Sequence, residues 1–342
     1  MNNRMNRRVP GRWVAIVVAL LGGTAVGEVT DCPEDLDGDG KVAGGDLAAL
    51  LASWGDCTTP CEADFDDNGR VDGGDLSTLL VAWSSGSVDP CRDVGVRIFD
   101  FDAEDVAPGI YTEEMLDDGW NEPSFSNGVR DGRVSVVEDP QQGRTLEFLY
   151  PEGEYGTSRT GAQWKLLFDR GYDRVRLRYR LRFEDGFDFV RGGKLPGLIG
   201  GAGNTGGGVP TGTDGWSARM MWRTDGRAVQ YVYHPDQPDN FGEDMPWSVD
   251  GEPVLFERGR WYDIEHEVSI NTPGVRDGSI VCRLDGVEVL RREGMRFRDV
   301  VDFAIDGLYV STFFGGSNSS WATTRDERIR FDDIEIDAFD LH

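Results

Sequence analysis

The sequence predicts a mainly β protein, a jelly-roll sandwich of antiparallel sheets, preceded by a small α-helical module. From about residue 95 onward, short runs of alternating apolar and polar residues are separated by glycine-rich turns, which is typical of half-buried strands. Few segments in that part have the length of a helix. Nearer the N-terminus, an aspartate-rich loop pattern occurs twice, and each copy precedes an apolar helical repeat.

Residues 1–27 have the features of a secretory signal. Several arginines precede a short apolar run over residues 13–21, and Ala25 and Gly27 flank a cleavage point. That run is too short to cross a bilayer, and no later stretch is long and apolar enough. We therefore expect a secreted protein without a membrane span, located outside the cell or at its surface.

The chain is strongly acidic, with a formal net charge of −27 at pH 7. Such a charge disfavours binding to nucleic acid or to anionic membranes. It also repels an acidic polymer, unless a locally basic cleft overrides it.

Four of the five cysteines cluster in the first quarter of the chain: Cys32, Cys57, Cys61 and Cys91. In a secreted protein this cluster predicts two disulfides, in any of three pairings. The fifth, Cys282, lies in a strand-like run and is expected to be a small buried hydrophobe.

An oxygen-rich loop pattern occurs over residues 35–46 and again over residues 64–75. Each copy has side-chain oxygens at loop positions one, three, five and twelve, with glycine at position six, where the backbone turns sharply. A Ca²⁺ ion requires this spacing of hard oxygen ligands. The predicted ligands are Asp35, Asp37, Asp39 and Asp46 in the first loop and Asp64, Asp66, Asn68 and Asp75 in the second.

A helix is expected after each loop, because apolar residues recur at i, i+3, i+4 and i+7. They are Leu47, Leu50, Leu51 and Trp54 in the first copy and Leu76, Leu79, Leu80 and Trp83 in the second. With its twin loops ending in aspartate, the region over residues 31–91 resembles a type I dockerin. The resemblance implies structural calcium and a cohesin-like or cell-surface anchoring partner.

The module departs from the dockerin pattern just before the last ligand of each loop. Many dockerins carry partner-reading Ser or Thr there, whereas this chain has Gly44-Gly45 and Gly73-Gly74. A calcium-stiffened spacer is therefore the alternative interpretation.

The clearest strand of the large domain, which covers residues 95–342, is predicted over residues 174–183. Five apolar side chains alternate there with five arginines, so the arginines share one face of a sheet. That face is either solvated or the wall of a groove for a polyanion. Similar alternation occurs over residues 261–270, 279–284, 287–292, 305–314 and 328–337, and Asp285-Gly286 is a good hairpin turn.

Lysine is scarce, since Lys41, Lys165 and Lys194 stand against thirty-two arginines. A lysine can exchange its proton when its pKa is shifted, whereas arginine stays charged. Lys194 lies in a segment framed by glycine and proline and is predicted to be functional. The alternative explanation is that the lysines arose by random sequence drift and have no function.

Two pairs of polar residues follow at period-two spacing. Ser217 and Arg219 share one face of a predicted strand, and Tyr231 and Tyr233 share one face of another. Over residues 191–233, five cationic residues stand against two aspartates. This local excess of positive charge is the feature that an acidic polymer would need.

These residue types suit β-elimination on a uronate polymer. The carboxylate beside the C5 proton must be neutralised, a base must take that proton, and an acid must protonate the departing O4. Tyrosine can do either proton transfer, but nearby cations must lower its pKa of about 10 before it acts as a base near neutrality. A cationic cluster beside two tyrosines meets these requirements without a metal.

At these residues the domain resembles the alginate and glucuronan lyases of polysaccharide lyase families 14 and 20, which are β-jelly rolls. The matching segments are GGKLPGL (192–198), WSARMMWR (216–223), YVY (231–233), STFFGG (311–316) and FDD (331–333). The resemblance implies a catalytic cleft of Lys194, Ser217, Arg219, Tyr231 and Tyr233. Arg219 would neutralise the carboxylate, with Lys194 or one tyrosine as base and the other tyrosine as acid.

Four further residues are expected to bind substrate: Arg191, Arg223, Trp216 and His234. For Trp216 the alternative is core packing, and for His234 it is a loop position without substrate contact. His266, which shares a strand face with apolar neighbours, is expected to be a satisfied core histidine.

The sequence thus predicts a secreted polysaccharide lyase for an acidic polymer of the alginate or glucuronan type, with no cofactor needed for catalysis. The main alternative is a non-catalytic carbohydrate-binding sandwich, although binding alone would tolerate arginine or phenylalanine at the lysine and tyrosine positions. A glycoside hydrolase would need two carboxylates facing the scissile bond. Asp214 and Asp225, the acids near the predicted cleft, have the sequence context of loops.

Overall fold

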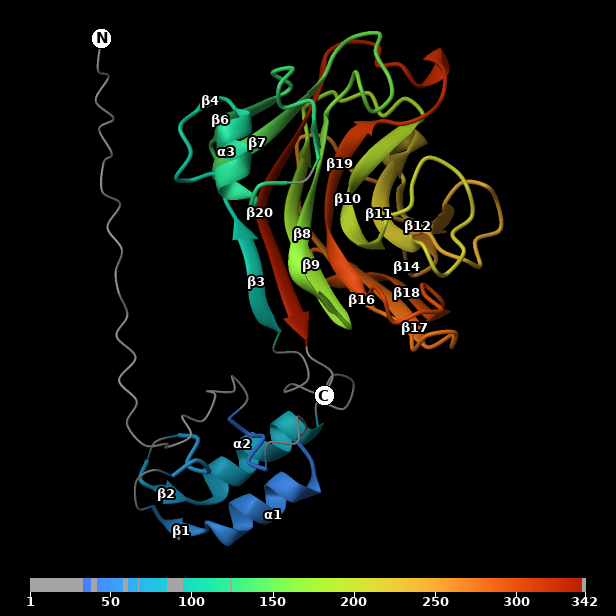
Figure 1. Cartoon of the computed structure of the whole chain (residues 1–342). Coiled ribbons are helices and arrows are strands. Elements are labelled where there is room, and N and C mark those ends of the chain that lie inside the picture. Colours follow the sequence, from blue (N-terminus) through green and yellow to red (C-terminus); the bar gives the residue numbers. More distant parts are fainter. Residues whose placement is uncertain are drawn as a thin grey trace, which may run out of the picture. The chain divides into compact units, whose positions relative to one another are not determined.

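The chain divides into two compact units, residues 1–91 and 92–342 (Figure 1). The computed structural model describes residues 33–37, 42–57, 61–66, 68–84, 95–123 and 125–339. The predicted signal peptide lies outside these residues, as do Cys32, Asp39 and Cys91. No helix in the described part of the chain is long and apolar enough to span a membrane.

The first unit has one helix after each aspartate-rich loop, as the repeat predicts. Its elements are α1 (Gly44–Ala52), β1 (Gly55–Asp56), β2 (Arg70–Val71) and α2 (Gly73–Ser84). Leu50 and Leu79, which occupy equivalent positions in the two copies, are fully buried.

Only part of each predicted apolar stripe is buried. Leu51 and Trp54 of the first copy, and Leu80 and Trp83 of the second, are all exposed. The core between two such short helices is too small to bury all four apolar side chains of each helix.

The second unit is a sandwich of two antiparallel sheets, which confirms the predicted fold class. In the described residues the larger sheet has the order β18-β17-β16-β9-β20-β7-β6-β4, with β3 also paired to β20. Its strands are β3 (Val96–Phe101), β4 (Gly109–Ile110), β6 (Val134–Asp139), β7 (Gly143–Tyr150), β9 (Arg174–Phe183), β16 (Trp261–Ser269), β17 (Gly278–Leu284), β18 (Val287–Met295) and β20 (Glu327–Phe339).

The smaller sheet has the order β13-β12-β11-β10-β19-β8-β5 within the described part. Its strands are β5 (Ser126–Asn127), β8 (Ala162–Tyr172), β10 (Gly192–Gly201), β11 (Gly215–Arg223), β12 (Ala228–Tyr233), β13 (Glu243–Pro246) and β19 (Ile305–Phe314). The short elements α3 (Glu113–Gly119), η1 (Thr224–Gly226), β14 (Ser248–Val249), β15 (Glu252–Pro253) and η2 (Ser319–Trp321) complete the unit.

The core lies between the two sheets, where alternate residues of facing strands meet. The Trp222 ring of β11 lies 5.5 Å from the Phe183 ring of β9, and Tyr179 of β9 donates a hydrogen bond to the sulfur of Met220 on β11. Because every second residue of β11 and β12 enters this core, the residues between them face the other side of the sheet.

The arginine stripe of β9 faces away from this core and is neutralised by acids on other strands of the larger sheet. Glu267 of β16 accepts hydrogen bonds from both Arg174 and Arg176, and Asp139 accepts from Arg182. The stripe is therefore part of a network of ion pairs on the larger sheet. Its arginines are paired with acids of the protein and do not form a groove for a polyanion.

Two residues of the core were singled out from the sequence. Cys282 is a buried free cysteine, in agreement with its predicted role as a small hydrophobe. His266 is buried as predicted, but neither ring nitrogen has a hydrogen-bond partner among the described residues. The prediction of a satisfied histidine is therefore wrong, and burial lowers the pKa of His266 to about 3, which keeps the ring neutral.

Candidate active site

A cavity of about 520 Å³ lies on the face of the smaller sheet that points away from the core. Four of the five predicted catalytic residues line it: Lys194, Arg219, Tyr231 and Tyr233. None of the described residues that line it is an aspartate or glutamate. The structure thus brings the predicted cationic cluster together in a hollow without carboxylates.

The strand register explains this convergence. Arg219 of β11 lies opposite Tyr231 of β12, and Ser217 lies opposite Tyr233. Lys194 of β10 lies opposite Met221 on the other side of β11. All these residues occupy the same face of neighbouring strands, because each strand alternates with period two.

A β-bulge in β10 shapes the floor of the cavity. The register shifts between Leu195 and Gly197, so that Leu195 and Leu198 are both buried in the core although they are three residues apart. Lys194 consequently stays on the cavity side, at the position where the strand is locally irregular. Bulges often re-aim side chains next to active sites.

Lys194 is held among cations and an aromatic ring. Its ammonium nitrogen lies 3.9 Å from the centre of the Tyr231 ring and 2.6 Å from the sulfur of Met221. Burial, followed by repulsion from Arg219 and Arg223, keeps the pKa of Lys194 well below its usual value. A lysine in this setting can be neutral and can accept a proton.

Arg219 is almost fully buried beneath the cavity, and the described residues that line the cavity offer it no carboxylate. One of its terminal nitrogens donates to Ser311 over 3.1 Å, and its guanidinium lies 5.3 Å from the Tyr309 ring. Its Nε has no hydrogen-bond partner in the described part of the chain. An arginine without an acidic partner is well suited to receive a carboxylate from a ligand.

The two tyrosines lie edge to face, with ring centres 5.6 Å apart. The Tyr233 oxygen accepts a hydrogen bond from the backbone N–H of Gly207 over 3.1 Å. Burial is the largest influence on Tyr231 and raises its pKa, which outweighs the opposing effect of the nearby arginines. The cations therefore do not lower the pKa of Tyr231 in the way that a tyrosine base requires.

Four of the nine predicted catalytic and substrate-binding residues do not line the cavity, namely Arg191, Ser217, Trp216 and His234. Ser217 is buried and donates to the Asn204 carbonyl over 2.7 Å. Trp216 is in the core, with its N–H donated to a carbonyl, which matches the core-packing alternative. His234 is buried and lies 2.8 Å from a carboxylate oxygen of Glu243.

Of the two predicted substrate-binding arginines, only Arg223 lines the cavity. Arg223 lines the cavity and forms a two-pronged ion pair with Asp244. Arg191 donates to Ser320 over 2.8 Å and stacks on the Trp321 ring at 5.0 Å. Arg191 therefore supports a neighbouring loop, and Trp321 from that loop lines the cavity.

Sequence reasoning did not identify Tyr309 and Gln163, which also line the cavity. The Tyr309 hydroxyl donates to the Gln163 side chain over 2.9 Å, and Ser311 donates to the same oxygen. Tyr309 lies two residues before Ser311 on β19, so the alternation already used for β11 and β12 would have placed it beside the site. Phe241 comes from a loop and Trp321 from the three-residue helix η2, and neither segment carries a periodic signal.

The aspartate-rich loops of the first unit gather carboxylates in both copies. Oxygen atoms of Asp35, Asp37 and Asp46 lie within 4.8 Å of one another, and the same holds for Asp64, Asp66 and Asp75. Asp46 and Asp75 are fully buried. Closely grouped carboxylates, one of them buried in each loop, repel one another unless a cation is present, so these donors fit Ca²⁺.

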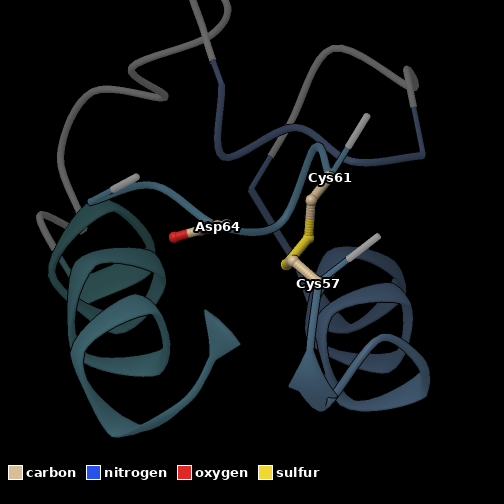
Figure 2. A group of neighbouring side chains, drawn as sticks. All are labelled: Cys57, Cys61 and Asp64. Carbon is tan, nitrogen blue, oxygen red and sulfur yellow. A yellow bond between two sulfur atoms is a disulfide. The ribbon is translucent and has the colours of Figure 1, made fainter. Parts of the chain in front are cut away.

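Cys57 and Cys61 form a disulfide, with α-carbons 5.8 Å apart. Figure 2 shows these sulfurs bonded to each other and the Asp64 carboxylate pointing away from them. The paired sulfurs are not thiolates, so this group is not a metal site despite the closeness of its three residues.

Comparisons with known proteins point to one class of enzyme. The family model described as polysaccharide lyase 14 matches residues 138–334. The structure of alginate lyase Aly36B is similar, with a TM-score of 0.63 and 26% identity over 71% of this chain and 98% of that chain. A PL-14 alginate lyase from Aplysia kurodai has a TM-score of 0.61 and 25% identity over 71% of this chain and 99% of that one.

Variants of Aly36B have been solved with alginate oligosaccharides. One variant, in which a lysine and a tyrosine are replaced by alanine, holds an alginate tetrasaccharide; it has a TM-score of 0.63 and 25% identity over 71% of this chain and 98% of that chain. No protein with a curated function matches the chain.

Proposed function

Because this chain belongs to polysaccharide lyase family 14, we propose that it cleaves a uronate polymer of the alginate type by β-elimination. One observation carries this proposal. A lysine whose pKa is lowered by burial lies beside two tyrosines and an unpaired arginine, in a cavity with no described carboxylate. The similarity to Aly36B supports the choice of polymer. A variant of that enzyme, in which a lysine and a tyrosine are replaced by alanine, was solved in complex with an alginate tetrasaccharide.

In the proposed reaction, Arg219 binds the substrate carboxylate and stabilises the negative charge that develops beside C5. The neutral amine of Lys194 takes the C5 proton, and the electrons of the broken C–H bond form the double bond between C4 and C5. The C4–O4 bond breaks, and the leaving oxygen takes a proton. No metal is needed, because Arg219 supplies the positive charge.

Tyr233 is the proposed acid. When its hydroxyl gives up a proton to O4, the hydrogen bond from the Gly207 N–H stabilises the phenolate that remains. Tyr231 has a different role, because its ring face lies against the Lys194 nitrogen and stabilises the ammonium that forms on proton transfer. The reaction thus creates two charges: Tyr233 carries the negative one, and Tyr231 stabilises the positive one on Lys194.

A hydrolase mechanism has no support in the cavity. It would need two carboxylates on either side of the scissile bond, and the described lining contains neither aspartate nor glutamate. Asp244, on the adjacent β13, is engaged with Arg223.

For the first unit, we propose that each loop holds a structural Ca²⁺ ion and that the unit anchors the secreted enzyme to a cohesin-like or cell-surface partner. Glycines support the calcium proposal. A side-chain carbon on Gly45 would lie 1.9 Å from an oxygen of Asp37, and one on Gly74 would lie 3.1 Å from an oxygen of Asp66. Glycine before each final ligand therefore leaves room for the loop carboxylates.

The catalytic proposal is tested by incubating the purified protein with alginate, glucuronan and a neutral glucan. A lyase produces ultraviolet absorbance from the unsaturated sugar end, and we expect it with alginate. A hydrolase would produce reducing ends without absorbance, and a binding module would produce neither signal. Absence of absorbance with both uronate polymers would refute the proposed reaction.

A further inference from the structure

Trp321 forms one wall of the cavity and is held there by its surroundings. Arg191 stacks on its ring and donates to the adjacent Ser320. Gly316, where φ is +130°, has no side chain, and a carbon at that position would lie 2.1 Å from the ring. Arg191 lies over the indole ring, and Trp321 lines the cavity, so part of the indole is placed where a ligand can contact it.

Phe241 forms another wall, from the loop between β12 and β13. It lines this cavity and also a second one, of about 650 Å³, that extends past Arg223 and Tyr231 toward β13. The ring is 58% exposed, although its loop is held internally by the buried side chain of Gln237, which donates to the Phe241 carbonyl. Because its ring is exposed and lines both cavities, Phe241 is positioned to contact a ligand.

The segments that carry the two walls are anchored at opposite ends of the proposed catalytic residues. The Trp321 loop begins at Gly315, whose N–H donates to the Gly192 carbonyl at the start of β10, next to Lys194. The Phe241 loop ends at Gly242, where a side-chain carbon would lie 2.9 Å from the Tyr233 ring.

The distance between these ends follows from the strand register. Lys194 lies opposite Met221, and Tyr233 lies opposite Ser217. These two positions of β11 are four residues apart, about 13 Å along an extended strand. A polymer that reaches both walls must therefore pass over Arg219, which lies between them.

We propose that Trp321 and Phe241 are stacking platforms for sugar rings on the two sides of the scissile bond, and that the enzyme therefore cleaves its polymer internally. The apolar face of a sugar ring packs on an aromatic face, whereas its carboxylate requires a cation, so stacking and charge recognition are divided between different residues. This inference rests on the proposed lyase activity, because it assigns the binding sites that flank the same reaction.

The test compares leucine with an aromatic replacement at each platform, since leucine retains apolar bulk but removes the ring. We expect Trp321→Leu and Phe241→Leu each to raise KM for alginate polymer about tenfold, which corresponds to about 1.4 kcal/mol. The value of kcat should stay within about twofold, because neither residue takes part in proton transfer. Trp321→Phe and Phe241→Tyr should retain a KM near that of the wild type.

Phe125→Leu is the matched control, because Phe125 is 42% exposed and is not among the residues that line the cavity. Internal cleavage is measured separately, as a fall in solution viscosity that precedes most of the rise in absorbance. An unchanged KM in both leucine variants would overturn the platforms, and release of a single short product from the start would overturn internal cleavage. Failure of the lyase proposal is distinguishable, since the wild-type protein itself would then give no absorbance.

Discussion

At the scale of single residues, Lys194 shows how the site trades stability for reactivity. Its amine is enclosed beside two arginines, and burial holds its pKa well below the usual value of 10.5. The unfolded chain binds a proton that the folded site resists, so placing this lysine in the cavity costs folding free energy. Residues that destabilise the fold in this way are common at active sites.

Lys194→Met should therefore raise the free energy of unfolding by about 1 kcal/mol near neutral pH while abolishing cleavage. The folded pKa is depressed, so between that pKa and 10.5 the unfolded state holds the extra proton and wild-type stability rises with pH. The advantage of the variant should consequently shrink as the pH approaches 10.5. Urea titrations at several pH values measure the difference, and an advantage that grows with pH would contradict the assignment.

Lys194→Arg and Tyr233→Phe should each lower kcat by about 10²- to 10⁴-fold, because each removes a positioned proton-transfer group. KM should change only a few-fold, since Arg219 still binds the carboxylate. Tyr172→Phe is the matched control, because Tyr172 is also buried but lies outside the cavity lining. Near-wild-type turnover in both site variants would exclude the proposed chemistry.

Sequence reasoning identified site residues where a local rule applied and failed where it did not. Period-two spacing placed Arg219, Tyr231 and Tyr233 on one side of the sheet, as the structure shows. The same spacing puts Ser217 on that side too, but spacing does not reveal that the loop at Asn204 covers it. A loop position depends on contacts between distant segments, and these are not encoded in any short sequence window.

At the scale of secondary-structure elements, alternation predicted strands well, but strand order could not be predicted. The hairpin between β17 and β18 turns at Asp285 and Gly286, both with positive φ, as the sequence predicted. In contrast, β20 lies between β9 and β7, which are far from it in the chain. Such pairings depend on closing long loops, and a local pattern contains no information about them.

The ion pairs of β9 lead to a prediction about the larger sheet. Glu267 accepts hydrogen bonds from Arg174 and Arg176, and its side chain is only 10% exposed. Glu267→Gln should lower the free energy of unfolding by about 2 kcal/mol, because its charge-assisted hydrogen bonds to the two arginines are lost. Chemical denaturation measures the loss.

Alginate cleavage by this variant should be unchanged, since the stripe lies on the sheet opposite the cavity. Asp185→Asn is the control, because Asp185 is 86% exposed and its pairing with Arg182 should contribute little. A large fall in cleavage without a loss of stability would instead indicate that the arginines contact the polymer.

At the scale of the whole molecule, the division into two units predicts separate responses to calcium. A chelator should lower the melting temperature of the first unit, because the grouped carboxylates around Asp46 and Asp75 then repel one another. The cleavage rate should be unaffected, since the cavity uses no metal in the proposed reaction. Calorimetry of the full chain with and without Ca²⁺ measures the first effect, and an unchanged melting profile would exclude the calcium sites.

The net charge of the whole chain affects the rate at which the enzyme associates with an acidic polymer. A charge of −27 repels a polyuronate at long range, whereas the cavity attracts it at short range through Arg219. Salt screens these two effects unequally, because the screening length falls from about 30 Å at 0.01 M to about 8 Å at 0.15 M. Screening therefore removes the distant repulsion before it weakens contacts inside the cavity.

We expect kcat/KM for alginate to rise as the ionic strength increases from about 0.01 M to about 0.15 M, with kcat nearly constant. Asp239→Asn provides a check at one position, because Asp239 lines the second cavity beside Phe241. Removing its negative charge should raise kcat/KM at low salt and have little effect at high salt. If kcat/KM instead falls steadily with added salt, attraction by the cavity controls the encounter, and the acidic surface does not hinder the polymer.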